Sequence, residues 1–251
     1  MSKLDRVKHL TLEDVPKAAR TLQESFANDS LARLLTCHVK DPKQKYELDI
    51  LLYEAYLRQH IAKGICLGIG ESEENFETVA IWSIPSSIDD GIESFHTLMA
   101  AGYGKLWEKA GPEGQQKIFE GMLPLLHDTS GKILATDKRF KNKGVYTLVY
   151  LGSVASARGK GNVRTIFEYM FKNYIDTPNS NNIAYLESSS PDNIPIYNKF
   201  GFHFYKDITL GDKDKLNAVE GDDYAVMNVM IRGSFGQDWT GSATPDSLHK
   251  L

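Results

Sequence analysis

Residues 145–175 constrain the fold of this 251-residue chain more than any other segment. Residues 145–152 (VYTLVYLG) favour a strand, and residues 165–175 (TIFEYMFKNYI) place apolar side chains at helical spacing. Between them, Gly159 and Gly161 allow a tight turn whose backbone N–H groups point inward. The positive end of the following helix lies just beyond this turn. The segment therefore predicts a site for a phosphate or pyrophosphate.

The turn also carries basic side chains, at Arg158, Lys160 and Arg164. They have two interpretations: cations around a bound anion, or solvated charges on an ordinary strand–turn–helix connection. A second segment further along the chain favours the anion site. There, an apolar strand at 183–188 ends in Glu and small hydroxyl residues, and residues 191–202 (PDNIPIYNKFGF) start a short helix and reach a glycine stop.

Together the two segments resemble the acetyl-CoA-binding motifs of the GCN5-related N-acetyltransferase (GNAT) superfamily. The first motif, Arg/Gln-x-x-Gly-x-Gly/Ala, is matched by Arg158-x-x-Gly161, except that Val163 stands where the family has glycine or alanine. A branched side chain there crowds the first turn of the helix. In its motifs the chain is most similar to puromycin-acetyltransferase-like and fungal small-molecule acetyltransferases. The second motif is matched, in order and spacing, by Leu186, Glu187, Asn193, Tyr197, Gly201 and Phe202.

The resemblance implies a mixed α/β (α+β) fold of the GNAT acyl-CoA N-acyltransferase type. Its central sheet is mixed but mostly antiparallel, and helices flank it. The resemblance also implies acetyl-CoA as the acetyl donor, with the pantetheine arm along the strand before the turn and the pyrophosphate at the turn. The cofactor-binding residues expected on this basis are Leu151, Gly152, Ser153, Val154, Arg158, Gly159, Lys160, Gly161, Asn162, Val163, Arg164, Asn193 and Tyr197.

Direct attack of an amine on a thioester in a ternary complex needs a proton donor for the departing thiolate. Tyr197 is the expected general acid, and the alternative is a tyrosine that only packs beneath the last strands. Glu187 would accept the amine proton or hold the substrate ammonium, unless it merely caps a neighbouring loop. Asn193 would bind the cofactor or act only as a helix cap. The expected acceptor-site residues are Phe26, Asp29, Trp82, Glu187 and Ser188, with plain core or loop roles as the alternative for Phe26 and Asp29.

Residues 1–233 are expected to form a single GNAT domain, with a helical insertion at about 86–142 and a polar C-terminal tail at 234–251. Aromatic residues of the insertion would cap the acceptor site or simply pack its helices onto the sheet. Trp239 is the residue expected to anchor the tail. Periodicity and turn signals predict a strand at 6–10, helices at 15–26 and 46–62, strands at 65–69 and 76–84, helices at 88–110 and 112–126, a solvated basic loop at 132–143, and strands at 203–209 and 224–231.

The net charge of −4 argues against a nucleic-acid binder, because no basic excess is available to neutralise phosphates. No apolar run is long enough to span a membrane. Cys37 and Cys66 lack the spacing of a disulfide framework or a metal site. These features predict a cytoplasmic protein without a metal or a membrane partner, and they leave a nuclear fraction and a homodimer open.

Three functions remain open at this point. The first is an acetyl-CoA-dependent N-acetyltransferase that acts on a primary amine of a small molecule. The second is a protein or peptide N-acetyltransferase, which the helical insertion disfavours because a peptide acceptor needs an open groove. The third is a non-catalytic CoA-binding sensor, against which the presence of Tyr197 in its motif is the main argument.

Overall fold

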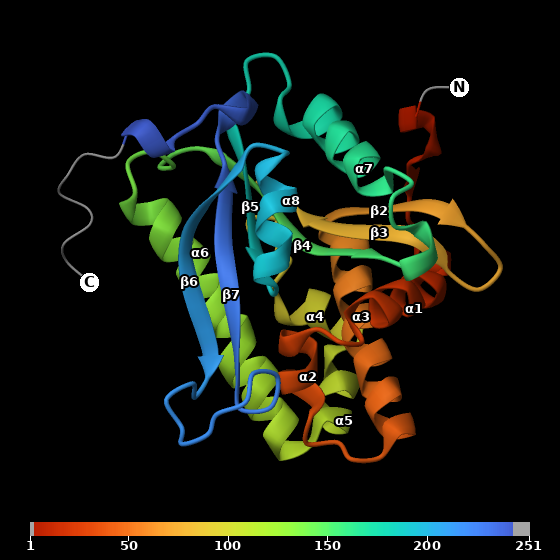
Figure 1. Cartoon of the computed structure of the whole chain (residues 1–251). Coiled ribbons are helices and arrows are strands. Elements are labelled where there is room, and N and C mark those ends of the chain that lie inside the picture. Colours follow the sequence, from red (N-terminus) through yellow and green to blue (C-terminus); the bar gives the residue numbers. More distant parts are fainter. Residues whose placement is uncertain (1–2, 243–251) are drawn as a thin grey trace.

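The computed structural model describes residues 3–242 and contains one seven-stranded sheet, ordered β1-β2-β3-β4-β5-β7-β6 (Figure 1). Only β4 and β5 run parallel, and every other neighbouring pair is antiparallel. The predicted mixed, mostly antiparallel sheet is therefore confirmed. The strands are β1 (Lys8–His9), β2 (Gly64–Glu71), β3 (Phe76–Ser83), β4 (Gly144–Ser153), β5 (Asn182–Ser188), β6 (Phe202–Gly211) and β7 (Tyr224–Arg232).

The parallel strands β4 and β5 pair along only the first part of their length. Pairing between β4 and β5 runs from Gly144 opposite Asn182 to Leu148 opposite Leu186 and then stops. Beyond that point β4 continues along β3 as far as Ser153, whereas β5 continues along β7. The sheet thus opens into a V whose inner edges carry backbone groups with no strand partner.

The N-terminal segment forms the predicted helix start. Thr11 and Asp14 form a capping box, in which the Thr11 backbone N–H donates to the Asp14 carboxylate at 2.9 Å. Pro16 lies in the first turn of the following helix, where its missing N–H is tolerated. The buried face of that helix contains Val15 and Leu22. The N-terminal helices are α1 (Val15–Phe26), α2 (Ser30–Thr36) and α3 (Pro42–Lys63).

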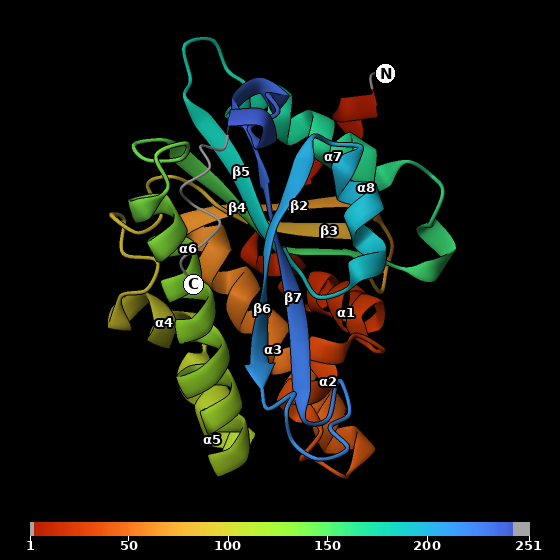
Figure 2. The same ribbon diagram turned by 60° about the vertical axis from the view of Figure 1, so that its left-hand side comes forward.

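Helices cover both faces of the sheet, as Figures 1 and 2 show. On one side, here called the α3 face, α1 to α3 and the helices between β3 and β4 enclose a core that includes Leu57 and Tyr185. On the other, the α7 face, α7 (Asn162–Met170) and α8 (Ile194–Asn198) enclose a second core around Phe167 and Phe202. Strands buried on both sides read as continuous apolar runs, which is the pattern of β3.

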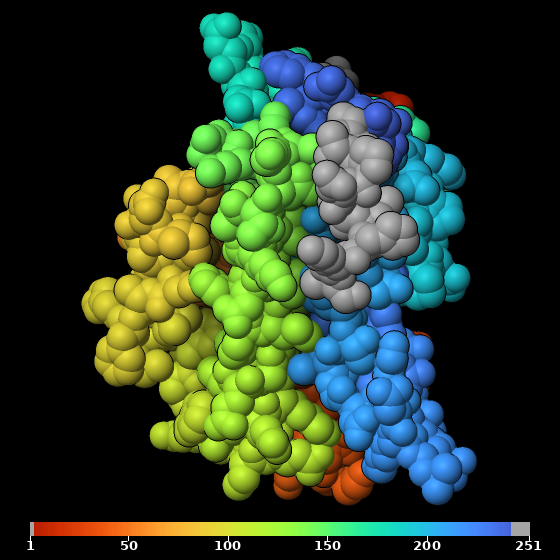
Figure 3. Space-filling view, turned by 90° about the vertical axis from the view of Figure 1, so that its left-hand side faces the viewer, coloured from red at the N-terminus to blue at the C-terminus, as the bar shows by residue number. Residues whose placement is uncertain are grey.

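The segment between β3 and β4 is helical, as predicted, but its boundaries differ. It consists of α4 (Phe95–Ala101), α5 (Tyr103–Gln115), a wider π-helical stretch (Gln116–Met122) and α6 (Leu123–Thr136). The predicted break is confirmed at Gly111, whose φ of 64° lies outside the helical range. The helix predicted from residue 88 instead begins at Phe95. Figure 3 shows α5 and α6 running beside β6 along one side of the molecule.

The prediction of a solvated basic loop at 132–143 is wrong in part. Its first residues belong to α6, because burial of Ile133 in the core offsets the weak helix propensity of the surrounding sequence. Its remainder is packed only in part: Phe140 is buried and the Arg139 guanidinium lies 4.7 Å from the centre of the Trp239 ring, whereas Lys138 and Lys141 are exposed as predicted. The exposed aromatic residues of the insertion, Phe95 and Trp107, lie outside the cavity described below.

Trp239 anchors the start of the predicted tail to the body of the protein. Its indole Nε1 donates a 2.9 Å hydrogen bond to the Ile231 carbonyl, and its ring meets Phe140 edge-on. Residues 243–251 of the predicted tail lie outside the described residues. No helix within 3–242 is both long and apolar enough to cross a membrane.

Candidate active site

A cavity lies where β4 and β5 separate, and side chains from both faces of the sheet line it. It contains about 810 Å³ of empty space, part of which opens to solvent. The opening of the sheet therefore connects the α3 face with the α7 face at one point. Of the residues predicted for the site, those that line this cavity are Phe26, Asp29, Leu151, Glu187, Ser188, Asn193 and Tyr197.

The glycine turn has the conformation that the sequence predicts. Gly159 and Gly161 have φ values of 81° and 79°, in the left-handed region that favours glycine. A Cβ at either position would meet nothing within 4 Å, so space is open on that side of the turn. Among the described residues, the backbone N–H groups of residues 161–164 donate no hydrogen bond. Unpaired N–H groups at the start of a helix are the usual donors to a bound phosphate.

The basic residues of the turn are partly engaged. The Lys160 ammonium pairs with Glu77 at 2.6 Å, and Arg164 lies 3.7 Å from Glu168. Arg158 is exposed and has no ion-pair partner among the described residues. Of the three predicted cations, Arg158 is therefore the one left free for a ligand.

Two predicted cofactor-binding side chains have other partners. Asn162 is buried; its Oδ1 accepts from Arg6 at 2.9 Å and its Nδ2 donates to Glu77 at 2.8 Å. Its side chain therefore holds the turn in place, and only its backbone N–H remains available. Val163 is half-buried and packs against the core of the α7 face. Because the Val163 side chain points into this core, it crowds the turn less than the sequence predicts.

The open edge of β4 carries the other predicted cofactor residues. Leu151 lines the cavity, and Gly152 is so close to α1 that a Cβ would lie 3.0 Å from Leu22 and Ser25. The Ser153 hydroxyl is hydrogen-bonded to Thr78 at 2.8 Å, and the Val154 N–H donates to the Glu77 carbonyl at 3.0 Å. The edge of β4 that has no strand partner therefore extends from the end of its pairing with β5, after Leu148, to the residue before Val154.

Tyr197 and Asn193 enter the cavity from the α7 face. The Tyr197 ring packs edge-on against Phe167 and Phe202, while its hydroxyl has no hydrogen-bond partner among the described residues. Burial raises the pKa of Tyr197 to about 12, and the negative charge of Asp29 contributes to this rise. The hydroxyl is therefore protonated at neutral pH. Asn193 precedes α8 but makes no capping hydrogen bond with its side chain, which leaves its amide free.

Glu187 approaches the cavity from the other face. It is half-buried at the end of β5 and forms no ion pair among the described residues. Burial raises its pKa to about 7, and the neighbouring Tyr185 hydroxyl opposes that rise. A carboxyl with this pKa can both gain and lose a proton near neutral pH. Ser188, one residue on, is buried and donates to the Ser190 carbonyl at 2.8 Å.

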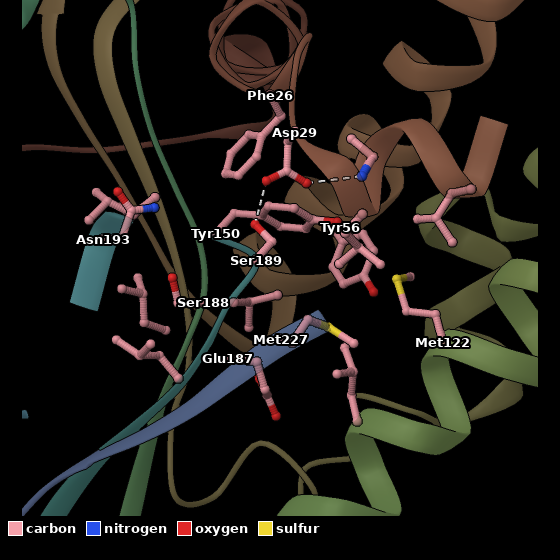
Figure 4. A pocket seen from close by; sticks show the side chains of 18 of the residues that line it. Phe26, Asp29, Tyr56, Met122, Tyr150, Glu187, Ser188, Ser189, Asn193 and Met227 are labelled. Carbon is pink, nitrogen blue, oxygen red and sulfur yellow. Dashed lines mark hydrogen bonds between the residues drawn. The ribbon is translucent and has the colours of Figure 1, made fainter. Parts of the chain in front are cut away.

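Asp29 lies at the start of α2, where its carboxylate caps the helix by accepting from the Ala32 N–H at 3.0 Å. It also accepts a 2.5 Å hydrogen bond from the Ser189 hydroxyl. Burial raises the pKa of Asp29 above its ordinary value, although these donors partly oppose the rise. Figure 4 shows Ser189 directed toward Asp29 and Ser188 directed toward Asn193, on opposite sides of the strand.

Sequence reasoning missed the aromatic wall of the cavity. Tyr53 and Tyr56 of α3 and Tyr150 of β4 line it beside Phe26, with ring centres 5.0–5.5 Å from Tyr150. Recurrence of apolar residues along 46–62 placed Tyr56 in a core, and nothing in that pattern distinguishes a core from a cavity wall. Trp82, predicted for the acceptor site, is fully buried on the α7 face against Phe167 and does not line the cavity.

Comparison with known proteins identifies the family of this chain. A Schizosaccharomyces pombe protein named as an uncharacterised N-acetyltransferase is 30% identical over 203 residues, covering 81% of this chain and 76% of that protein. The chain belongs to the GNAT superfamily. This GNAT protein is accordingly an acyltransferase. A scan against protein-family models finds no match.

Solved structures share the fold of this GNAT protein. One of a histone acetyltransferase HPA2 and related acetyltransferase from Corynebacterium glutamicum superposes with a TM-score of 0.56 at 19% identity, covering 96% of this chain and 97% of that one. Arylalkylamine N-acetyltransferase 2 from Aedes aegypti superposes with a TM-score of 0.56 at 15% identity, and the match covers 91% of this chain and 98% of that one. A Drosophila melanogaster polyamine N-acetyltransferase that forms N-acetylagmatine superposes with a TM-score of 0.53 at 12% identity, and the match covers 90% of this chain and 98% of that one.

Proposed function

We propose that this protein transfers the acetyl group of acetyl-CoA to a primary amine of a small molecule. The observation that carries the proposal is the cavity at the opening of the sheet. It brings an unpartnered, protonated Tyr197 hydroxyl from the α7 face together with the carboxylates of Asp29 and Glu187 from the α3 face. A proton donor and proton acceptors at one gap are what amine acylation requires.

The residues present fit acetyl-CoA. The N–H groups of residues 161–164 and the exposed Arg158 would hold the pyrophosphate, and the open edge of β4 around Leu151 would pair with the pantetheine amides. The free amide of Asn193 lies on the same side of the gap. Acetyl-CoA supplies an acetyl group activated as a thioester, so the protein needs no covalent intermediate.

The chain's own residues then move protons and fix geometry. Tyr197 would donate the proton on its Oη to the departing sulfur. The Asp29 carboxylate would accept a proton from the attacking amine, and Glu187 would hold an ammonium group of the substrate. Much of the rate acceleration would come from alignment of the two substrates across the gap.

The acceptor proposed is a small molecule rather than a peptide. Met122, beside α6, and Leu126 in α6 line one side of the cavity, and Leu35 of α2 lines another, so that helices surround the acceptor side. A peptide would need an open groove in their place. The fold neighbours from Drosophila and Aedes, which act on a polyamine and on arylalkylamines by their names, support the same choice.

The test is calorimetric titration with acetyl-CoA, followed by a thiol-release assay with a panel of small amines and a panel of peptides with free N-termini or lysines. We expect acetyl-CoA binding, and thiol release that depends on a small amine. Release that depends only on peptides would favour the protein acetyltransferase. Binding without release from any acceptor would favour a CoA-binding sensor, and no binding would refute the proposal.

A further inference from the structure

We infer that the acceptor is a short linear diamine, whose reacting nitrogen lies beside Asp29 while its second ammonium lies deeper in the cavity against Glu187. This inference rests on the proposed function and names its substrate class. It follows from the placement of the two carboxylates, from the absence of an ion pair to either of them among residues 3–242 and from the wall between them.

The first observation is the placement of the carboxylates. Side chains two residues apart on a strand point to the same face, with attachment points roughly 6–7 Å apart. Glu187 lies near the end of β5 and Ser189 is the first residue after that strand, and Ser189 holds Asp29 through the 2.5 Å hydrogen bond. Figure 4 shows Asp29 with Ser189 at one end of the group and Glu187 directed away from them at the other. The cavity therefore has two separate acidic ends.

The second observation is the charge balance. No Lys, Arg or His lines the cavity, and neither Asp29 nor Glu187 forms an ion pair among residues 3–242. Burial raises the pKa of both carboxyls, in agreement with the absence of a cation from the cavity lining. Desolvated charges without a partner are costly, and two cations supplied by one ligand would compensate both.

The third observation assigns the two ends. The Asp29 charge acts on Tyr197, the proposed acid, whereas the Glu187 charge acts on Tyr56 and Tyr185. Pairing between β4 and β5 ends at Leu186, so Glu187 lies next to the closed end of the opening, whereas Ser189 and the Asp29 that it holds lie farther out. We therefore assign Asp29 to the side of the reaction centre and Glu187 to the deeper side. The Tyr185 hydroxyl is fully buried beside Glu187, beneath the cavity lining.

The fourth observation is the wall between the ends. Phe26, Tyr53, Tyr56 and Tyr150 give an apolar aromatic lining. Such a lining suits a methylene chain, and aromatic rings also attract ammonium groups. In the reaction the amine nitrogen bonds to the acetyl carbon as the carbon–sulfur bond breaks. Of the two protons lost by the reacting ammonium, one leaves through Asp29 and the other replaces the proton that Tyr197 gives to the sulfur.

The test compares putrescine with n-butylamine, which has the same carbon chain and lacks the second amine. We measure kcat and KM by thiol release, and binding by calorimetry, for the wild type and for Glu187→Gln, Asp29→Asn and Glu113→Gln. Glu113 is an exposed carboxylate on α5 outside the cavity and serves as the control.

We expect the wild type and the Glu113→Gln control to prefer putrescine in kcat/KM by roughly 30-fold, the scale of a desolvated charge pair. Glu187→Gln should abolish this preference through KM, and Asp29→Asn should lower kcat for both amines. Equal kcat/KM for both amines in the wild type, or an unchanged preference in Glu187→Gln, would overturn the inference while leaving the proposed function standing. Calorimetry separates the two claims without turnover: putrescine binding that Glu187→Gln removes supports the diamine site even if acetyl transfer fails, and equal binding of both amines refutes it.

Discussion

The Ser189 hydroxyl donates a 2.5 Å hydrogen bond to the Asp29 carboxylate, although 160 positions separate the two residues in the chain. This contact joins the residue after β5 to the residue that caps α2. Asp29 also accepts from the Ala32 N–H, so that its carboxylate is held from two sides. Its orientation at the cavity is therefore fixed before any substrate arrives.

Replacement of Ser189 by Ala should disturb Asp29 without unfolding the protein. The variant loses a donor that favours the ionised carboxylate, so the pKa of Asp29 should rise further. We expect kcat/KM for amines to fall about tenfold, which corresponds to about 1.4 kcal/mol. The acidic limb of the pH profile should move to higher pH. Ser189→Thr, which keeps the hydroxyl, should recover most of the activity; an unchanged pH profile in Ser189→Ala would contradict the role given to this contact.

Replacement of Tyr197 by Phe should separate catalysis from binding. The ring packing against Phe167 and Phe202 is retained, and only the protonated hydroxyl is lost. We expect kcat to fall roughly 100-fold or more, the scale of general acid catalysis, while the Kd for acetyl-CoA stays within a few-fold. Tyr174→Phe, at a half-buried position outside the cavity, is the matched control. Turnover equal to that of the wild type would remove the proton-donor role.

Replacement of Gly161 by Val should weaken acetyl-CoA binding. Its φ of 79° strains a branched residue by roughly 1–2 kcal/mol, and the strain falls on the turn that presents the unpaired N–H groups. We expect the Kd for acetyl-CoA, measured by calorimetry, to rise at least about tenfold. Unchanged affinity would place the pyrophosphate elsewhere.

Val163→Ala provides the control for this turn. Val163 packs against the core of the α7 face, so its truncation should cost about 1 kcal/mol of stability and leave the Kd for acetyl-CoA nearly unchanged. Denaturant titration and calorimetry on the same sample distinguish the two effects. A large loss of affinity in Val163→Ala would mean that this side chain shapes the turn directly.

Glu187→Gln should stabilise the ligand-free protein, and more so at alkaline pH. The folded pKa of about 7 exceeds the ordinary value of 4.5, so the carboxyl ionises more easily in the unfolded chain. The stability that its protonated form contributes is complete below pH 4.5 and is lost as the pH rises to about 7. We expect the difference in unfolding free energy between variant and wild type to increase by about 2 kcal/mol from pH 5 to pH 8, allowing for partial exposure of the group. A difference independent of pH would show that Glu187 is not perturbed in the folded state.

Several elements could be predicted because their signals are local. The helix that begins at Val15, the break at Gly111 and the turn at Gly159 depend on backbone preferences within a few residues. The end of α6 could not be predicted in this way. Its weak helix-forming sequence is held by burial of Ile133, which depends on contacts distant in the chain.

The misplacement of Trp82 has a similar physical cause. Alternation of polar and apolar residues indicates which side of a strand faces the core, but residues 78–82 are buried on both sides of β3. Nothing in their sequence therefore tells which side chain faces the acceptor. For the same reason the sequence does not predict that Tyr53, Tyr56 and Tyr150 line the cavity, because aromatic residues fit a core as well as a cavity wall.

The sequence by itself determined the strand, the glycine turn and the helix that follows it, and also the order of the two family motifs. Each of these depends on residue types at fixed short spacing, where backbone conformation and hydrogen bonding are local. Only the tertiary structure decided that Tyr197 and Glu187 reach one cavity from opposite faces, and that Ser189 holds Asp29 there. These relationships arise because β4 and β5 stop pairing after Leu148 and Leu186, and that separation is set by packing across the whole sheet.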